Sequence, residues 1–373
     1  SEFVNNGTFN FTTAGCELNY DGDDGNDFTN NGTINMTAGG TLKISSVSSP
    51  TIEAGAATFT AGSGTVEYDL LGGNQAIDAV TYNNLIINGN DLNDIKTASA
   101  NLNVNGDLTV TNGNLTLNNI ALTLGGDFSM INGSFDPGIS DLHNVAGIWN
   151  ETGGVFQPID GTFTFSGTGG KTIAQNTGNN FWDLTIASGG INKISANSPI
   201  SVSGVFTNTN GTFDTEGNTV EVDGVTNIDG GILEIAAGTF DANNTFDANG
   251  ANVTFTGAGT LKLGGATVDL GILEAILNDG TVEYDFDGDQ GIFDATYHHL
   301  EIDNNTGTAT AGSALAVQGN LTITNGNLTL NDALTLTGDF FLTSGTLVPG
   351  SSDLHTVSGN WNDAGGIFDG TIG

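Results

Sequence analysis

Hydrophobic and polar residues alternate over very short runs along this chain. Runs such as NLNV, DLTV, NLTL, ALTL and DFSM place apolar residues at every second position, and each run is followed by Gly, Asn or Asp. A period of two is typical of β-strands, and these small residues are typical of turns. The pattern predicts many short strands. The segment 271–280, GILEAILNDG, comes nearest to a helical period, but it is short and lacks an N-cap, so we read it as a strand.

The same period assigns side chains to two faces. In one stretch the positions expected to face inward are all apolar: Leu108, Val110, Leu115, Leu117, Leu122, Leu124 and Phe128. The Thr and Asn residues between them are expected to face outward. Strands this short do not form a free-standing sheet, so successive turns of the chain must stack on one another to bury the apolar face.

Internal repeats organise the chain. The sequence GDLTVTNGNLTLN at 106–118 returns as GNLTITNGNLTLN at 319–331, and the match extends outward to GTVEYD, HNVAGIWN and their second copies. We therefore expect four segments: divergent N-terminal coils at 1–63, a first copy at 64–160, a divergent middle unit at 161–279 and a truncated second copy at 280–373. Self-similarity of this kind is typical of stacked repeat architectures.

These features predict an all-β protein, a parallel β-solenoid (right-handed β-helix) whose four segments form one continuous rod. Gly and Asn suit the corners, because they adopt positive φ at little cost. The alternative is a row of tandem Ig-like β-sandwiches of about 100 residues each. Sandwich strands are usually longer, and here proline is scarce and tryptophan is not regularly placed, so the solenoid is favoured.

Composition narrows the set of partners. Five lysines and no arginine stand against 42 acidic residues, which gives a net charge of -37. Phosphate binding needs clustered basic residues, so nucleic acid and anionic membrane surfaces are excluded as partners. A single cysteine, Cys16, excludes an intramolecular disulfide, and no apolar run is long enough to span a membrane. The start SEFVNNG has neither an initiator Met nor a signal peptide, which indicates part of a longer chain.

The succession GTVEYD, TYNNLII, NLNVNGDLTVTNGNLTLN, ALTLGGDF and HNVAGIWNETGGVF resembles the Gly/Asn/Thr-rich repeats of large secreted surface adhesins of Bacteroidota. More distantly, it resembles the β-helical shafts of filamentous-haemagglutinin-type adhesins. The resemblance covers most of 64–373 and is carried by composition as much as by position. It implies an extracellular protein at the bacterial cell surface, and it brings no catalytic motif that could be transferred to this chain.

Rare residues gather in SDLHNVAGIWN and in its second copy, SDLHTVSGNWN. In a strand that runs from His143, Trp149 shares its face, and His355 and Trp361 are related in the same way. A metal-binding or catalytic histidine needs further ligands at suitable spacing, and neither copy offers another His or a Cys nearby. We therefore expect the two tryptophans to fill the core and the two histidines to cap a strand or pack beside it.

A second histidine pair, His298 and His299, replaces Asn83 and Asn84 of the first copy. Adjacent residues of a strand point to opposite faces, which predicts that these two imidazoles do not converge on one ion.

Two acidic turns, YDGDDGND and YDFDGDQG, are candidate calcium sites, because calcium prefers oxygen ligands in Gly-containing turns. The second turn resembles the start of an EF-hand loop but has Gln where that loop needs Gly, and it lacks the closing Glu. The first copy has YDLLGGNQ there and keeps only Asp69. The candidate calcium ligands are Asp21, Asp23, Asp24, Asp27, Asp285, Asp287 and Asp289.

Two other activities fit less well. Thr-x-Thr pairs such as Thr109 with Thr111 suggest an ice-binding solenoid, but the pairs fall at irregular separations. Polysaccharide lyases built on β-helices typically use a basic residue, often Arg, and this chain has only five scattered lysines. A hydrolase needs a carboxylate pair, which 42 acidic residues would supply by chance.

The sequence therefore predicts a non-enzymatic, extracellular structural or adhesive segment of a long repetitive bacterial surface protein, an adhesin stalk or filament. Surface glycans, or the surface of a host or neighbouring cell, are the expected partners. The alternative is a glycan-binding or glycan-cleaving β-helix that acts through its acidic turns and exposed aromatic residues such as Trp182.

Overall fold

A computed structural model of the chain describes residues 2–22, 27–46, 50–190, 192–274, 279–352 and 354–370. Within these residues every regular element is a β-strand, and each pair of neighbouring strands is parallel where its register is defined. Most consecutive strands along the chain belong to different sheets, and strands pair with the equivalent strand one turn later. The protein is thus a parallel β-solenoid. Ig-like sandwiches are excluded, because their sheets are antiparallel.

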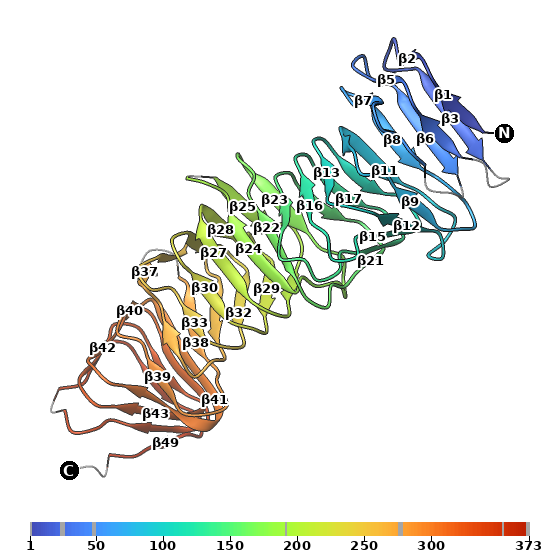
Figure 1. The fold of residues 1–373 in the computed structure, drawn as a ribbon. Coiled ribbons are helices and arrows are strands. Elements are labelled where there is room, and N and C mark those ends of the chain that lie inside the picture. The colour runs from blue at the N-terminus through green and yellow to red at the C-terminus, as the bar shows by residue number, and fades with distance from the viewer. Residues whose placement is uncertain are drawn as a thin grey trace. The chain divides into compact units, whose positions relative to one another are not determined.

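The chain forms two compact units, Ser1–Asp183 and Leu184–Gly373. In unit 1 three sheets form the sides of each full turn (Figure 1). The first side consists of β3 (Glu17–Gly22), β6 (Thr41–Ser46), β8 (Thr65–Tyr68), β11 (Asn84–Ile87), β14 (Leu108–Val110), β17 (Phe128–Met130), β20 (Trp149–Glu151) and β23 (Lys171–Ala174). The second consists of β9 (Gln75–Ile77), β12 (Ile95–Ala98), β15 (Asn114–Thr116), β18 (Ser134–Asp136) and β21 (Val155–Phe156).

The third side of unit 1 consists of β10 (Thr81–Tyr82), β13 (Leu102–Val104), β16 (Leu122–Leu124), β19 (His143–Val145) and β22 (Thr162–Phe165). Two small sheets accompany the first strands of the first side in the N-terminal coils. They contain β1 (Phe3–Asn5) with β4 (Phe28–Asn30), and β2 (Thr8–Asn10) with β5 (Thr33–Asn35) and β7 (Thr58–Thr60).

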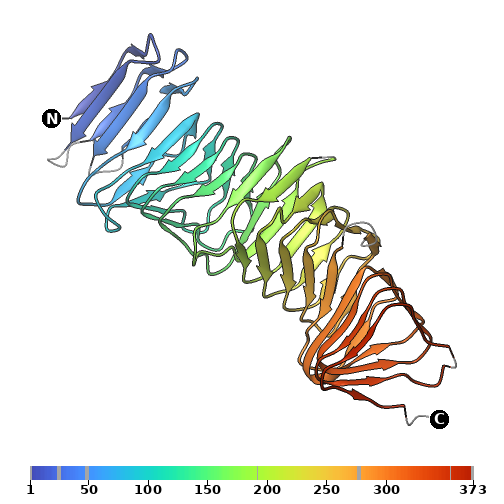
Figure 2. The same cartoon turned by 180° about the vertical axis from the view of Figure 1, so that it is seen from behind.

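Unit 2 has the same layout, seen from behind in Figure 2. Its earlier turns use β24 (Asp183–Ala187), β27 (Phe206–Asn210), β30 (Thr226–Ile228), β33 (Phe246–Asp247) and β36 (Val268–Asp269) on one side. A second side has β25 (Lys193–Ala196), β28 (Thr212–Asp214), β31 (Ile232–Ile235), β34 (Asn252–Phe255) and β37 (Ile272–Glu274). A third begins with β26 (Ile200–Val202), β29 (Thr219–Val222), β32 (Thr239–Ala242) and β35 (Thr260–Leu263).

The third side of unit 2 continues into the second copy. There it includes β38 (Thr281–Tyr284), β41 (His299–Ala311), β43 (Leu321–Leu330), β45 (Phe340–Leu342) and β48 (Trp361–Asp363), with β39 (Gln290–Ile292), β46 (Thr346–Val348) and β49 (Ile367–Phe368) attached. The last sheet has β40 (Thr296–Tyr297), β42 (Leu315–Val317), β44 (Leu334–Leu336) and β47 (Thr356–Val357). The long strands β41 and β43 bend where their pairing register shifts, between Ile302 and Thr308.

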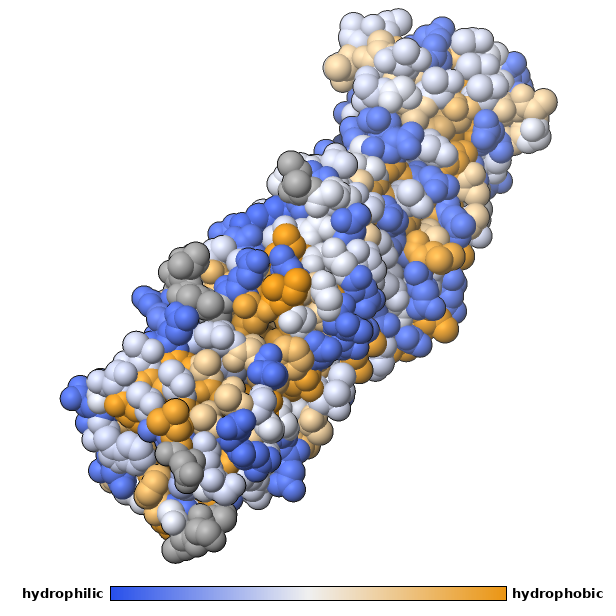
Figure 3. Space-filling model, turned by 90° about the vertical axis from the view of Figure 1, so that its left-hand side faces the viewer, coloured by the Kyte–Doolittle hydropathy of each residue, from blue (hydrophilic) through white to orange (hydrophobic). Residues whose placement is uncertain are grey.

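The core runs along the inside of the turns, as the alternation predicts. All seven residues of the predicted inward row, from Leu108 to Phe128, are fully buried. Register explains the packing, because Leu108 pairs with Phe128 and Leu102 with Leu122, so like positions of successive turns stack in columns. The outer face mixes polar and apolar residues (Figure 3). Among the described residues, no helix is long and apolar enough to cross a membrane.

Glycines occupy many of the corners, as expected. Gly113, Gly133 and Gly154 all have φ near 80°, and Asn118 and Asn119 also adopt positive φ. Left-handed backbone at these positions allows the chain to turn sharply between strands. The segment 271–280 contains a strand, β37, as expected, and its residues 275–278 lie outside the described part of the chain.

Candidate functional site

The conspicuous His-Trp stretch turns a corner. We expected one strand from His143 to Trp149, and this is wrong: β19 ends at Val145 and β20 begins at Trp149, and the two strands belong to different sheets. Gly147 lies at the corner between them, where a Cβ atom would overlap the carbonyl oxygen of Gly126 in the turn below. Both aromatic side chains nevertheless point inward, because the corner preserves the inward face of each strand.

His143 caps a strand, which confirms the structural prediction. Its Nδ1 atom accepts the backbone N–H of Leu122 at 3.2 Å, and its ring stacks on Phe163 with 4.5 Å between the centroids. Since Nδ1 is an acceptor, Nε2 carries the proton in the neutral ring. Nε2 is buried and has no hydrogen-bond partner among the described residues. Burial lowers the pKa of His143 to about 4, so the ring is neutral at neutral pH.

Trp149 is fully buried at the centre of an aromatic cluster, as predicted. Its ring stacks on Phe128 at 3.9 Å, and four more rings lie within 6.1 Å: Phe156, Phe163, Phe165 and Phe181. The indole N–H donates to Glu151 at 2.6 Å. Burial raises the pKa of Glu151, while hydrogen bonds from Asn179, Asn176 and Trp149 oppose that rise. The carboxylate therefore holds the aromatic cluster to the following turn.

The second copy repeats the cap but not the burial. His355 Nδ1 accepts the N–H of Leu334 at 3.1 Å, in the same way as His143. Trp361 occupies the same inward position as Trp149, in register with buried Phe340, but it is 45% exposed. The reason is geometric. Trp361 stacks on Phe340 at 4.4 Å from one side, and it lies in the last turn that the structure describes, where no described turn covers its other side.

Both copies also contain a buried tyrosine pair that the sequence analysis missed. Tyr68 and Tyr82 approach with their hydroxyl oxygens 2.8 Å apart, and Tyr284 and Tyr297 with theirs 2.9 Å apart. In each pair the second tyrosine donates to a backbone carbonyl four residues earlier. A buried glutamine accompanies each pair and donates to a carbonyl of the preceding turn. Identity of these polar residues between the two copies was the signal that could have revealed them.

The corners are joined by a row of side-chain bonds that we call the corner ladder. At each step a side chain accepts the backbone N–H of the equivalent residue one turn later. In the first copy the row is Asn84 to Asp107 (3.0 Å), Asp107 to Asp127 (2.9 Å) and Asp127 to Ile148 (2.8 Å). In the second copy it is His299 to Asn320 (2.8 Å), Asn320 to Asp339 (3.0 Å) and Asp339 to Asn360 (2.7 Å).

A glycine precedes each recipient of the corner ladder. A Cβ atom on Gly106, Gly126 or Gly147 would overlap the backbone or the capping side chain of the turn below, and the same holds for Gly319, Gly338 and Gly359. Only glycine allows the corners to stack this closely. The recurring Gly-Asp and Gly-Asn pairs of the sequence therefore encode the stacking of one corner upon the next.

The second acidic turn does not gather its carboxylates. Asp285 lies 3.7 Å from Lys262, Asp287 accepts from Asn305 at 3.1 Å, and Asp289 accepts the N–H of Thr308 at 3.1 Å. Each carboxylate thus has its own structural partner. In the first turn Asp21 and Asp27 are exposed, whereas Asp23 and Asp24 lie outside the described residues. Calcium binding at these turns stays a prediction.

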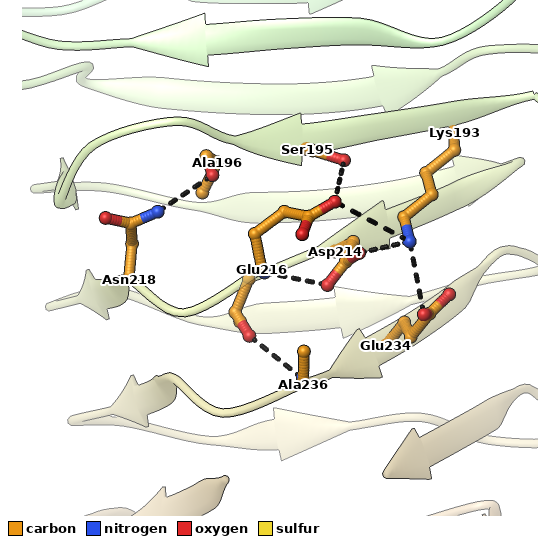
Figure 4. A network of polar contacts seen from close by, with 9 residues as sticks. Lys193, Ser195, Ala196, Asp214, Glu216, Asn218, Glu234 and Ala236 are labelled. Atoms are coloured by element: carbon orange, nitrogen blue, oxygen red, sulfur yellow. Dashed lines mark hydrogen bonds and ion pairs between the residues drawn. The ribbon is translucent and has the colours of Figure 1, made fainter. Parts of the chain in front are cut away.

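Three of the five lysines lie among acidic residues on neighbouring turns. Lys43 contacts Glu67 at 3.2 Å, and Lys262 contacts Glu283 at 2.7 Å, at equivalent positions of successive strands. Lys193 is surrounded by Asp214, Glu234 at 3.2 Å and Glu216 at 3.9 Å (Figure 4). These acidic partners raise the pKa of each lysine, against the effect of burial. Each lysine ammonium group reduces the repulsion between carboxylates that lie close together on stacked turns.

Lys96 differs from these lysines, because it is fully buried inside the first copy. Its Nζ atom donates to the carbonyl of Leu70 at 2.7 Å. Burial lowers its pKa to about 8, although the nearby Asp94 and Asp69 favour the charged form. Asp94 is itself buried and accepts the backbone N–H groups of Gly72, Gly73 and Asn90. Asp94 thus fixes the 88–94 loop and Lys96 bonds to the preceding turn, whereas the second copy has a bulged strand in place of this loop.

The two rings of the histidine pair lie side by side, so the expectation that they point to opposite faces is wrong. His298 lies in a bend between β40 and β41 rather than within a strand, so the alternation of faces does not apply to it. The two ring centroids are 4.4 Å apart. The Nδ1 atom of His298 lies 3.2 Å from Oδ1 of Asp279. Asp279, His298 and His299 form the one group of three or more metal-ligating side chains found among the described residues.

Comparison of the chain with protein-family models, with curated proteins and with solved structures finds no match.

Proposed function

We propose that this chain is a non-enzymatic structural segment, a stalk or filament, of a long repetitive surface protein that acts outside a bacterial cell. The main support for the proposal is that the hydrogen bonds of the solenoid run from one turn to the next. The corner ladder, the strand pairing and the buried caps all join one turn to the next. Force applied along the stack would therefore load many parallel interactions together, which suits a load-bearing spacer.

The charge supports the same role. With a net charge of -37, neighbouring copies repel each other, which opposes lateral association. The edges of strands within the stack are already paired, so association by added strands is also limited to the ends. The resemblance to adhesin repeats supports a position at the cell surface, where such a spacer would hold a binding region away from the cell.

Small-angle scattering of the whole chain tests the proposal. A stalk segment is expected to scatter as one elongated, stiff particle, with the same profile at low and high ionic strength. Compact particles joined by a flexible link would contradict it.

A glycan array with the same preparation addresses the alternative function. A spacer is expected to give no signal above that of an unrelated acidic protein. Trp182 is 36% exposed and lies just before β24. Specific binding that is lost in Trp182→Ala, with the melting temperature unchanged, would replace the stalk proposal with a glycan-binding one.

A further inference from the structure

The cluster of Asp279, His298 and His299 is built from two successive turns of unit 2. Thr281 of β38 pairs with His299 of β41, so the residues just before the two strands lie one above the other. Asp279 precedes β38 by two residues and adopts a positive φ of 57°. The bend at His298 turns its ring back toward Asp279, and one candidate ligand atom from each of the three residues lies within 4.8 Å of the other two.

The separations suit a small divalent ion. Zinc-type ions bind His nitrogen and carboxylate oxygen at about 2.0–2.2 Å, which in a tetrahedron separates the ligand atoms by roughly 3.3 Å. The His298 Nδ1 and Asp279 Oδ1 atoms are 3.2 Å apart. His298 Nδ1 is buried and has no hydrogen bond within the described structure, so its only polar contact is the Asp279 carboxylate. Two imidazoles with one carboxylate favour zinc, nickel or copper over calcium, which prefers oxygen ligands.

The first copy provides an internal comparison. At the three equivalent positions it has Ser63, Asn83 and Asn84, so all three side chains differ together. The corner ladder does not require this change, because Asn84 Oδ1 accepts the N–H of Asp107 just as His299 Nδ1 accepts that of Asn320. At this corner three residues that can bind a metal replace three residues that bind metals poorly. The corner ladder forms with either set, so the fold does not explain the change.

We propose that Asp279, His298 and His299 bind a divalent transition-metal ion of the zinc class and thereby join two successive turns at the corner. The lone pair of His299 Nδ1 already receives the Asn320 N–H. Nε2 then carries the proton of the neutral ring, so binding of the ion through either nitrogen must displace that bond, which weakens binding relative to a site with three uncommitted ligands. Water would complete the coordination, since Asp279 is exposed.

Isothermal titration of the whole chain with Zn²⁺ tests the site. One ion per chain is expected, together with a melting temperature that rises with zinc concentration and returns to its starting value with chelator. Copper gives a second measurement, because electron paramagnetic resonance of bound Cu²⁺ is expected to show coupling to imidazole nitrogen.

The matched control is the triple variant Asp279→Ser, His298→Asn, His299→Asn, which installs the residues of the first copy. It retains a side-chain acceptor for Asn320 and every acidic turn, so it is expected to fold, as circular dichroism would verify, and to lose the stoichiometric zinc signal. Equal zinc binding by this variant would overturn the proposal and assign the ion to carboxylates elsewhere. Absence of binding by the natural chain at millimolar zinc would overturn it as well.

Discussion

The two copies of the repeat have nearly the same inward pattern but differ in what covers it. In the first copy Trp149 and His143 lie beneath further turns and are fully buried. In the second copy Trp361 is 45% exposed, although its neighbours in sequence are almost the same. Burial in a solenoid therefore depends on the turn that follows as well as on the residue. The sequence of one repeat determines which side chains point inward, and the stacking of further turns determines how far those side chains are buried.

The copies also differ at one corner. The first copy forms two strands, β11 and β12, with the 88–94 loop between them; buried Asp94 bonds to that loop, and buried Lys96 bonds to Leu70 of the preceding turn. The second copy runs through the same region as one long, bulged strand, β41, and has Ala309 in place of Lys96. A buried charge thus accompanies the loop and is absent where the loop is absent.

The largest expected effect separates the two tryptophans. Trp149→Ala should cost about 3–5 kcal/mol, because it opens a cavity inside the aromatic cluster and leaves Glu151 without its indole donor. Trp361→Ala should cost about 1–2 kcal/mol, since nearly half of its side chain already contacts solvent. Chemical denaturation monitored by circular dichroism measures both. Equal losses would show that Trp361 is covered in solution and would remove the difference between the copies.

A second, smaller effect concerns the buried cap. The pKa of His143 is lowered to about 4 in the folded chain, whereas an unfolded histidine titrates near 6.5. Between these pH values His143 is protonated in the unfolded chain and neutral in the folded chain. The free energy of unfolding therefore falls as the pH drops from 6.5 to 4. The loss is on the order of 3 kcal/mol at pH 4.

His143→Leu is the control for this effect, because leucine occupies the same column at Leu102 and Leu122. The variant loses the acceptor for the Leu122 N–H, which costs about 1 kcal/mol independently of pH. Denaturation curves of the two proteins, measured from pH 4 to pH 7, give the difference between their free energies of unfolding. The contributions of all other titrating groups cancel in this difference. A difference that stays constant across this range would contradict the buried, neutral state of His143.

Much of the fold could be predicted, and the reasons for the failures are physical. The period of two located the inward row and the caps, because alternation depends on local backbone geometry. The alternation made wrong predictions where the chain bends. At Gly147 the chain turns a corner between two strands, and the bend at His298 brings two adjacent rings together. Bends of this kind depend on how closely the turn below approaches, which a single repeat does not reveal.

The buried polar residues were harder to anticipate. Tyr68 and Tyr82 bond to each other and Tyr82 to the backbone, and Gln75 donates to a carbonyl of the preceding turn, so their burial depends on partners that only the folded chain supplies. Lys96 looked like one of five scattered lysines, but it occupies an inward position of β12, in register with buried Gln75 and Leu115. The corner ladder was present in the sequence as recurring Gly-Asp and Gly-Asn pairs, which we interpreted only as turns.

The smallest expected effect tests the buried lysine of the first copy. The pKa of Lys96 is lowered to about 8 in the folded chain, against an ordinary value of 10.5. Between these values the unfolded chain binds the proton and the folded chain does not, so stability rises as the pH increases, by about 2 kcal/mol from pH 8 to pH 10. Lys96→Met keeps the apolar stem without the charge and should remove this slope.

The acid-paired lysines and the buried tyrosines titrate above this range when folded, so the slope difference between the two proteins, measured by denaturation, belongs to Lys96. If both proteins gave the same slope, Lys96 would have to reach solvent, and Asp94 alone would be the buried charge beside the loop.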